Sequence, residues 1–300
     1  MEEGIFEYSL EKLNKHFAMK NISKKLALPS YNKLLGIRMC EIAFKMAAEN
    51  AELFGNSIKD FIDYSMDFLK LQIELEKTGQ YKYKTFEEIQ KNVYENKNVM
   101  DNMYLNGLLL SQSFWTNHNQ ILSFFIDKFS KNNKENGSVL EVPIGTGIFM
   151  SEFSNHNQMW KGTGYDLSES SVQYAKKVLK INSPDQDIKV SQKNIFEINN
   201  STKYDRIICG ELLEHLEEPE KLLQKLNLLV KNDGKVFLTT AIWAAAIDHI
   251  YLFRSVEEVK QMLLKYFKIE DEIVLNVFDN KKPTDSKTPI NYACILSKRL

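Results

Sequence analysis

The sequence predicts an α/β fold built on a seven-stranded, mostly parallel sheet and preceded by an all-helical region. After residue 137, short apolar runs alternate with helical segments, which is the pattern of βαβ units around a buried parallel sheet. The last two apolar runs are joined by a loop, Asn280–Pro289, where a parallel crossover would need a helix. We therefore expect the final strand to be antiparallel and to lie at the edge of the sheet.

The second half, residues 134–300, carries the expected strands. They are Ser138–Ile144, Gly162–Asp166, Ile188–Val190, Tyr204–Gly210, Lys235–Ala241, Asp271–Phe278 and Tyr292–Ser297. Helices are expected between the earlier strands, at Glu169–Lys180, Glu218–Val230 and Val256–Tyr266. These segments predict one α/β domain.

The first half, residues 1–133, is predicted to be a helical domain. Its apolar residues recur at spacings of three and four, which is typical of amphipathic helices. The expected helices are Leu34–Phe54, Ile58–Lys77, one that begins at Thr85, and a long or broken stretch at Asn98–Lys131. We expect this region to cover the active site, to contribute to a homodimer, or both.

Composition excludes several classes of protein. The 39 Lys and Arg residues nearly balance 40 Asp and Glu residues, which argues against nucleic-acid binding because that function usually needs a basic excess. The longest apolar run, Leu238–Ile247, is too short to span a bilayer, so no membrane partner is expected. The three cysteines are far apart and odd in number, which fits reduced thiols in a cytoplasmic protein.

A glycine loop follows the first expected strand, within Val139–Phe149. Gly145 and Gly147 allow a tight turn and close approach of the backbone to a ligand. The third glycine of the dinucleotide-binding pattern is replaced by Met150. Glu141 precedes the loop at the strand end, where a carboxylate would repel a pyrophosphate but suit a cationic amino acid or sulfonium. A nicotinamide cofactor is therefore disfavoured.

Asp166 closes the second expected strand, nineteen residues beyond Gly147. A carboxylate at this position can accept both hydrogen bonds from a ribose diol. Its alternative role would be to cap the next helix, but Ser168 is already a competent cap. We therefore favour the ribose role for Asp166.

These segments resemble the successive motifs of class I S-adenosylmethionine-dependent methyltransferases. The resemblance covers residues 138 to 300 and rests on Glu141, Gly145–Gly147, Asp166 and Tyr204–His215, and it is closest to the branch with ubiquinone-biosynthesis and natural-product enzymes. It implies a Rossmann-like sheet with a reversed last strand, which matches the strands read from the sequence. It also implies S-adenosylmethionine as the cofactor, with S-adenosylhomocysteine as the product.

The resemblance assigns cofactor-binding residues by position in the motifs. Glu141 and the glycine loop would hold the methionine part, Asp166 the ribose, and Asn194 with Ile195 the adenine. The complete set is Glu141, Pro143, Gly145, Thr146, Gly147, Asp166, Leu167, Asn194, Ile195 and Glu211. Many members of the family have an acidic residue where this chain has Asn194, and Pro143 is unusual and would reshape the strand end.

Candidate catalytic residues follow the fourth and fifth expected strands, since open α/β sheets bind ligands at the carboxyl ends of their strands. Glu211 and His215 follow the fourth, and His249 follows the fifth. Any of them could lie near the sulfonium or the acceptor. His215 could equally cap the following helix or support the cofactor loop, and His249 could be structural. Trp243 and Tyr251, in the same loop as His249, are candidate substrate contacts.

The helical half offers a further candidate surface. Tyr104, Ser111, Trp115 and His118 are spaced so that they share one helix face with Leu108. This face could form a lid over the acceptor or an ordinary contact between helices.

The predicted function is methyl transfer to an oxygen or nitrogen of a small molecule in specialised metabolism. Methylation of carbon, on an α-keto acid or an activated ring, is the alternative reaction. A cofactor-binding partner without activity is the alternative from another class, which the intact cofactor residues disfavour. The sequence shows no acidic cluster at metal-ligand spacing, so no metal site is expected.

Overall fold

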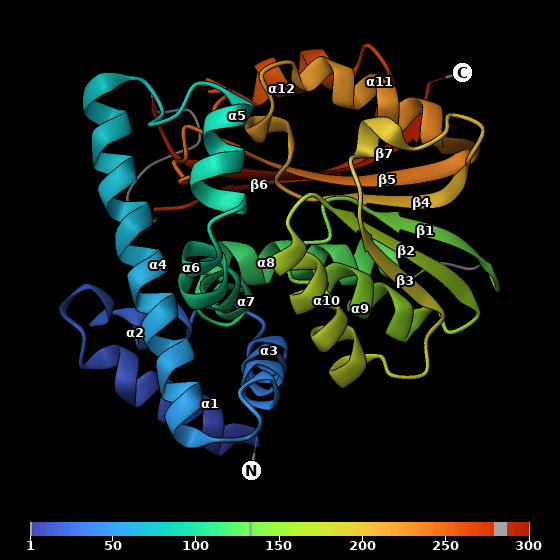
Figure 1. Ribbon diagram of the computed structural model, residues 1–300. Helices are drawn as coiled ribbons and strands as arrows, with labels where there is room; N and C mark the ends of the chain where they lie inside the picture. The colour runs from blue at the N-terminus through green and yellow to red at the C-terminus, as the bar shows by residue number, and fades with distance from the viewer. Residues whose placement is uncertain (1, 132–133, 279–286, 300) are drawn as a thin grey trace.

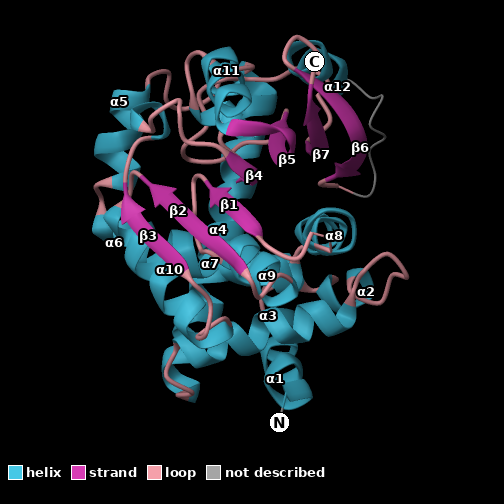
Figure 2. Ribbon diagram, turned by 90° about the vertical axis from the view of Figure 1, so that its right-hand side faces the viewer, coloured by secondary structure: helices cyan, strands magenta, loops and turns pink. Residues whose placement is uncertain are grey.

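The computed structural model describes residues 2–131, 134–278 and 287–299 of the chain. A twisted sheet forms one half of the molecule, and a group of helices from the N-terminal part of the chain lies beside and beneath it (Figures 1 and 2). Most of the loop expected at Asn280–Pro289 lies outside the described residues, as do residues 132 and 133 of the boundary between the two predicted domains.

The sheet has seven strands in the order β3-β2-β1-β4-β5-β7-β6. The strands are β1 (Gly137–Glu141), β2 (Trp160–Asp166), β3 (Ile188–Gln192), β4 (Tyr204–Cys209), β5 (Val230–Ile242), β6 (Phe267–Asn276) and β7 (Ile290–Lys298). β1 to β5 pair in parallel, whereas β7 pairs antiparallel with both β5 and β6. The predicted α/β class and the reversed last strand are confirmed.

The position of the last strand differs from the prediction, which placed it at the sheet edge. β7 lies between β5 and β6, and seven of its nine residues, from the first, are buried. β6 is the edge strand, and most of its residues are half-buried. β7 is thus an interior strand, and β6 takes the less buried position at the edge.

β1 is shorter than the predicted strand Ser138–Ile144, because it ends at Glu141. Pro143 follows across a cis peptide bond and has no N–H to donate to a neighbouring strand. The expectation that Pro143 reshapes this strand end is therefore correct. The chain turns away from the sheet here and forms the glycine loop.

Helices cover both faces of the sheet. α9 (Ile148–His156) and α10 (Glu169–Asn182) lie on one face, and α11 (Pro219–Leu229) and α12 (Val256–Leu263) lie on the other (Figure 2). Neighbouring strand residues alternate between the two faces: Val139 belongs to the core under α9, and Leu140 to the core under α11. The predicted helices in this half are confirmed.

The first half is helical throughout its described length. Its α-helices are α1 (Glu2–Asn14), α2 (Ile22–Lys25), α3 (Lys33–Met46), α4 (Ala51–Thr78), α5 (Phe86–Ile89), α6 (Lys97–Val99), α7 (Leu105–Phe114) and α8 (Thr116–Phe124). Thr85 caps α5 in a capping box with Glu88, as its sequence indicates. The predicted helix Leu34–Phe54 is wrong at its end, since Ala48 and Glu49 take left-handed conformations that separate α3 from α4.

The helical half shares a hydrophobic core with the sheet. One cluster of buried side chains includes Phe6 and Phe54 from the helices, Phe125 just after α8, and Phe237 of β5. Arg38 of α3 also forms a salt bridge with the buried Glu152 of α9. This packing holds the helices against the strand ends, while the domain boundary after residue 133 stays a prediction.

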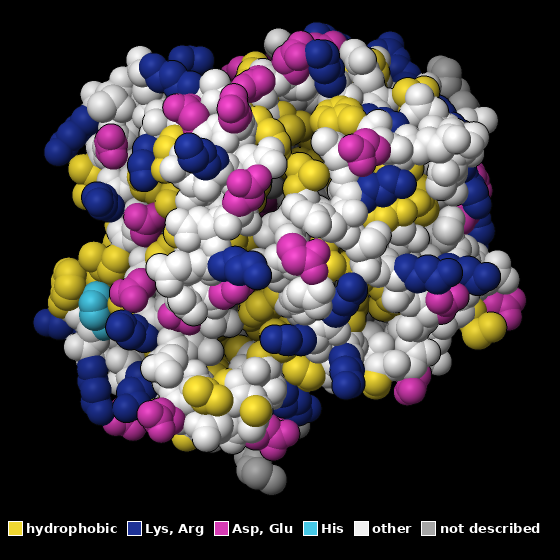
Figure 3. Space-filling model, viewed as in Figure 1, with side chains coloured by type: hydrophobic (Ala, Val, Ile, Leu, Met, Phe, Trp, Pro, Cys, Tyr) yellow, Lys and Arg dark blue, Asp and Glu magenta, His cyan; other side chains and the backbone are white. Residues whose placement is uncertain are grey.

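The surface carries charges of both signs. On the face shown in Figure 3, lysine and arginine side chains are interspersed with acidic ones over both halves of the molecule. Among the described residues, no helix is long and apolar enough to cross a membrane.

Candidate active site

The glycine loop connects β1 to α9. Gly145 and Gly147 both have positive φ, at 49° and 76°, a conformation that other residues adopt at a cost. A Cβ atom on Gly147 would lie 3.0 Å from the Cβ of Ala175 in α10, whereas one on Gly145 would enter open space. Gly147 therefore allows close helix packing, and Gly145 leaves room for a ligand beside the backbone.

Glu141 lies at the end of β1 with its side chain turned to the start of α9. Its Oε2 accepts a hydrogen bond of 2.8 Å from the backbone N–H of Met150. Burial raises the pKa of this carboxyl well above its usual range. A carboxyl group thus occupies the N-terminal end of the helix, where dinucleotide-binding folds place a pyrophosphate.

Asp166 joins the end of β2 to the glycine loop. Its Oδ2 accepts a hydrogen bond from the N–H of Gly145 and its Oδ1 one from the N–H of Ser168, each at 2.9 Å. Burial raises the pKa of Asp166 to about 6, against the opposing effect of these N–H groups. Ser168 caps α10 through the N–H of Ser171, so Asp166 is not needed as the cap.

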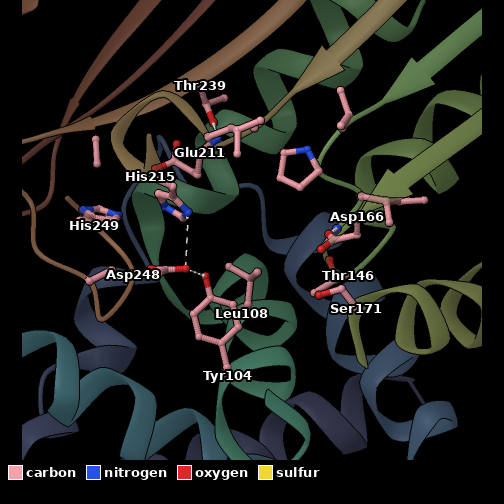
Figure 4. Close-up of a pocket in the computed structure, with 18 of the residues that line it drawn as sticks. Tyr104, Leu108, Thr146, Asp166, Ser171, Glu211, His215, Thr239, Asp248 and His249 are labelled. Atoms are coloured by element: carbon pink, nitrogen blue, oxygen red, sulfur yellow. Dashed lines mark hydrogen bonds and ion pairs between the residues drawn. The ribbon is translucent and has the colours of Figure 1, made fainter. Parts of the chain in front are cut away.

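A cavity of about 420 Å³ lies between the strand ends and the N-terminal helices, a size typical of small-molecule sites. Most of the predicted site residues line it. They are Tyr104, Trp115, His118, Glu141, Pro143, Gly145, Thr146, Asp166, Leu167, Asn194, Ile195, Glu211, His215 and His249. In Figure 4, Asp166 and Thr146 lie on one side of this space and Glu211, His215 and His249 on the other.

Four predicted site residues do not line the cavity. Gly147 is turned toward α10, as its contact with Ala175 shows. Ser111 is fully buried, and its hydroxyl contacts Nδ1 of His118 at 2.7 Å. Trp243 and Tyr251 point away from the cavity and pack beside other residues of the core around β5 and β7. Ser111 thus lies behind His118, and the predicted substrate contacts of Trp243 and Tyr251 are not supported by the cavity lining.

The predicted helix face around Trp115 is interrupted by Trp115 itself. This residue has an extended backbone and separates α7 from α8. Its ring stacks on Tyr64 of α4, with 5.4 Å between centroids, and meets His118 edge-on at 4.9 Å. Burial lowers the pKa of His118 to about 4, so this ring is neutral at pH 7. One wall of the cavity therefore consists of aromatic side chains from the helical half, which we call the aromatic roof: Tyr64, Tyr104, Trp115 and His118.

Asn194 follows β3 and begins a short helical turn. Its side-chain oxygen accepts a hydrogen bond of 3.0 Å from the N–H of Phe196. The amide oxygen, which we expected to bind an adenine amino group, is already engaged but keeps a second lone pair. Ile195 is buried beside it, and Leu167 remains 38% exposed at the rim.

Glu211 follows β4 and has an unusual backbone for a residue other than glycine, with φ of 48°. Its N–H bonds both the carbonyl and the hydroxyl oxygen of Thr239 in β5, at 3.1 and 3.0 Å. Left-handed backbone costs on the order of 1 kcal/mol and is concentrated at functional sites. These two hydrogen bonds hold Glu211 at the cavity wall.

Glu214 is fully buried, three residues after Glu211. Its Oε2 accepts a hydrogen bond of 2.7 Å from the hydroxyl of Thr240, and its Oε1 one of 3.1 Å from the N–H of Ala241. Burial, together with the adjacent carboxyl of Glu211, raises the pKa of Glu214 well above its usual range. The carboxyl group of Glu211 thus adjoins that of Glu214.

The two candidate histidines come together although they follow different strands. The rings of His215 and His249 lie 5.1 Å apart. Burial lowers the pKa of both, that of His249 to about 4, so both rings are neutral at pH 7. His215 does not cap α11, whose first position has no side-chain cap.

Asp248 is the residue that links the roof to the histidines, and it was not among the predicted site residues. Its Oδ2 accepts hydrogen bonds from the hydroxyls of Tyr104 at 2.8 Å and Tyr94 at 3.3 Å, and lies 3.5 Å from Nδ1 of His215 (Figure 4). Burial opposes its ionisation, but His215 and His249 outweigh burial and lower the pKa of Asp248. The position next to His249 was the available signal, yet the partner is His215.

Comparison with known proteins assigns the chain to a family. A family model described as a methyltransferase domain matches residues 114–281, more than half of the chain. A ubiquinone biosynthesis O-methyltransferase of Coxiella burnetii is 34% identical over 107 residues, which are 34% of this chain and 42% of that protein. The chain therefore spans less than half the length of this relative.

Solved structures of low sequence identity share the fold. The pyocyanin biosynthetic protein PhzM is 13% identical, with a TM-score of 0.54 over 80% of this chain and 72% of that one. The mitomycin 7-O-methyltransferase MmcR is 10% identical, with a TM-score of 0.53 over 78% and 68%. The fold, the matched family model and the placing of Glu141, Gly145 and Asp166 agree: the chain belongs to the class I S-adenosylmethionine-dependent methyltransferases.

Proposed function

We propose that this protein transfers a methyl group from S-adenosylmethionine to an oxygen or nitrogen of a small-molecule acceptor in specialised metabolism. The observation that carries the proposal is one cavity with two chemically different ends. Asp166 and the glycine loop line one end, and Glu211, His215 and His249 line the other (Figure 4). A cofactor at the first end would face an acceptor at the second.

The residues at the first end fit S-adenosylmethionine. Glu141 and Asp166 are buried carboxyl groups that line the cavity, and each suits a donor or a cation on a ligand. An amino acid ammonium, a sulfonium and a ribose diol supply such groups. A pyrophosphate does not, and Glu141 already accepts from the helix N–H that would bind one. This arrangement supports a sulfonium cofactor over a nicotinamide dinucleotide.

The residues at the second end fit the acceptor. When bound, S-adenosylmethionine supplies a methyl group that a nucleophile takes by in-line displacement, with the sulfur keeping the electron pair. Tyr104 and Trp115 would exclude water and align the acceptor, which is the main requirement of such a reaction. Glu211, His215 or His249 would receive the proton that an acceptor hydroxyl or ammonium gives up.

Two further assignments accompany this function. The cysteines Cys40, Cys209 and Cys294 are buried free thiols, which fits the reducing cytoplasm. A homodimer through the helical region stays a proposal, which analytical ultracentrifugation would test. The small-molecule acceptor is the binding partner that we expect in the cavity.

Calorimetric titration with S-adenosylmethionine, S-adenosylhomocysteine and NADH tests the cofactor. Binding of the two sulfur ligands alone, with a dissociation constant in the micromolar range, is expected. Binding of NADH alone would overturn the proposal in favour of an oxidoreductase. Failure of all three to bind folded protein would leave the fold assignment standing and would remove the main argument for methyl transfer.

A screen of acceptors with methyl-labelled S-adenosylmethionine tests the reaction. Products labelled on oxygen or nitrogen support the proposal. Products labelled on carbon would favour the alternative reaction on an α-keto acid or an activated ring. The absence of any transfer to a broad set of acceptors, by protein that binds the cofactor, would count against catalysis.

A further inference from the structure

We propose that Glu211, Glu214, His215 and His249 bind a divalent transition-metal ion at the acceptor end of the cavity. This ion would hold an acceptor through two oxygen atoms on adjacent carbons. The metal site is inferred from the side chains alone, whereas its role toward the acceptor rests on the proposed methyl transfer. No metal site was predicted from the sequence, because the possible ligands come from two loops that only the fold brings together.

The spacing of the possible ligand atoms suits one ion. One nitrogen or oxygen of each of Glu214, His215 and His249 lies within 4.8 Å of the others. The distance from Oε1 of Glu214 to Nε2 of His249 is 3.9 Å. Ligands bound at about 2.1 Å can lie up to about 4.2 Å apart on the same ion. A small contraction would therefore bring all three atoms onto one metal.

His249 is oriented as a metal ligand by its backbone contact. Its Nδ1 lies 2.9 Å from the carbonyl oxygen of Ala244, which can only accept a hydrogen bond. Nδ1 therefore carries the proton, and Nε2 has the free lone pair. Metal-binding histidines usually donate the other ring N–H to a carbonyl or a carboxylate in this way.

His215 has the same arrangement. Its Nδ1 lies 2.9 Å from the hydroxyl of Tyr94, which itself donates to Asp248. The hydroxyl oxygen of Tyr94 is thus available to accept from Nδ1, and Asp248 stands 3.5 Å from the same nitrogen. A proton on Nδ1 leaves the lone pair on Nε2, so both histidines present the same unprotonated nitrogen.

The carboxyl groups of Glu211 and Glu214 are fixed in place but keep lone pairs that could bind an ion. Each oxygen of Glu214 accepts one hydrogen bond, from Thr240 or from Ala241, and keeps another lone pair. Glu211 is fixed through its backbone by Thr239, and its carboxyl adjoins that of Glu214. Among the described ion pairs, the partner of Glu214 is a histidine, with no lysine or arginine within 4 Å. A divalent ion could therefore bind Glu214 without displacing a lysine or arginine.

Asp248 provides a second, independent indication of a ligand. It is fully buried, and its Oδ1 has no hydrogen-bond partner among the described residues. A buried polar atom without a partner is unfavourable because it has lost its hydrogen bonds to water. A metal-bound water or an acceptor hydroxyl beside His215 could donate to this oxygen. The proposed site therefore also accounts for an otherwise unexplained acceptor atom.

The donor set selects the kind of ion. Two imidazole nitrogens and two carboxylates suit Mn²⁺, Fe²⁺, Co²⁺ or Zn²⁺ better than Mg²⁺ or Ca²⁺, which prefer all-oxygen sites. Four ligands leave further coordination positions of the ion open. Glu211, His215 and His249 line the cavity, so these open positions would face it. Two adjacent oxygens, as in a catechol or the enol of a 2-oxo acid, could fill these positions.

Titration of the full-length protein with Mn²⁺, followed by electron paramagnetic resonance, tests the site directly. The protein is first freed of metal with a chelator, and no cofactor or acceptor is added. One Mn²⁺ bound per chain, with nitrogen modulation from imidazole in the pulsed spectrum, is expected. Binding without nitrogen modulation, or no binding by folded protein, would overturn the proposal.

Matched variants locate the ion. His249→Ala and Glu214→Gln should each weaken Mn²⁺ binding at least tenfold, whereas His156→Ala, at an exposed site, should leave it unchanged. Unchanged binding in both cluster variants would place the ion elsewhere. His249→Gln serves if the alanine variant does not fold, since its shorter amide should weaken binding and remove one source of nitrogen modulation.

Separate titrations distinguish this proposal from the proposed function. Protein that binds S-adenosylmethionine but not Mn²⁺ would lose the metal site and keep the methyltransferase. Protein that binds Mn²⁺ but not S-adenosylmethionine would keep the metal site and lose the proposed methyltransferase activity. With Mn²⁺ bound, catechol or pyruvate should change the manganese spectrum, and phenol should not. The acceptor class is identified by whether catechol or pyruvate changes the spectrum. Equal effects of phenol and catechol would refute chelation by two oxygens.

Discussion

The carboxylate of Asp166 accepts a hydrogen bond from the N–H of Gly145 at 2.9 Å, and so ties the end of β2 to the glycine loop after β1. A second N–H, from Ser168, holds its other oxygen. Both bonds fix the orientation of the carboxylate before any ligand arrives. Each oxygen keeps a lone pair for a donor from the cavity.

Asp166→Ala should weaken S-adenosylmethionine binding by about tenfold to a hundredfold, or about 1.4–2.8 kcal/mol. The change removes both the ligand's acceptor and the support of the glycine loop. Calorimetry measures the effect. Asp185→Ala, at an exposed position in the loop before β3, is the control and should leave the affinity unchanged. Equal affinities for the two variants would remove Asp166 from the cofactor site.

His249→Ala should leave S-adenosylmethionine affinity within about twofold of the original, because this residue lies at the other end of the cavity (Figure 4). Methyl transfer should nevertheless fall strongly, since the acceptor end loses a ligand or proton acceptor. The same calorimetric titration, combined with the labelled-methyl assay, separates the two effects. A loss of cofactor affinity as large as in Asp166→Ala would contradict this division of the cavity.

Trp115→Ala should raise the KM of the acceptor about tenfold and leave the affinity for S-adenosylmethionine nearly unchanged. The indole lines the cavity and stacks on Tyr64, so its removal opens the roof above the acceptor. Trp115→Phe should recover most of the affinity because it restores an aromatic surface. Steady-state kinetics with the acceptor found in the labelled-methyl screen measures both. If KM is unchanged in the alanine variant, the roof does not contact the acceptor.

That Glu141, Gly145 and Asp166 line one cavity could be predicted because the signals are local. Gly145 and Gly147 mark the loop, and Glu141 and Asp166 stand at the ends of strands that the apolar pattern reveals. The order of the strands was harder to predict. β7 inserts beside β5 through long-range pairing, which no local pattern near Tyr292 encodes.

The acceptor end could not be assembled from the sequence, since its geometry depends on contacts from the helical half. The loop after β5 is held by Gln72 of α4, whose side chain bonds the carbonyl of Trp243 and the N–H of Ala245. Tyr81 adds a bond of 2.9 Å to the carbonyl of Ala244. These bonds fix the backbone of the loop that carries His249.

Stability should depend on Asp205, which lies at the start of β4 and away from the cavity. It is 2% exposed and accepts hydrogen bonds from Lys134, from Lys231 at 2.8 Å and from the N–H of Ser138 at 2.9 Å. Burial opposes its ionisation, but these donors outweigh burial and hold the pKa of Asp205 well below its usual range. The charged form is therefore favoured in the folded protein.

Asp205→Asn should lower the free energy of unfolding by about 2 kcal/mol at pH 7, since hydrogen bonds to a charged group are lost. Because the folded pKa is depressed, the contribution of Asp205 is complete above the unfolded pKa of about 3.9 and is lost as the pH falls toward the folded value. The difference between the two proteins should thus shrink below about pH 4. Urea unfolding at several pH values measures it.

Asp233→Asn is the matched control for this prediction. Asp233 also lies near Lys134, at 3.9 Å, but its side chain is 79% exposed. An exposed pair of this kind contributes less than about 1 kcal/mol, so the control should unfold almost as the original protein does at every pH. If Asp205→Asn were no more destabilising than Asp233→Asn, or if its effect grew on acidification, the buried carboxylate would not stabilise the fold in the way its contacts indicate.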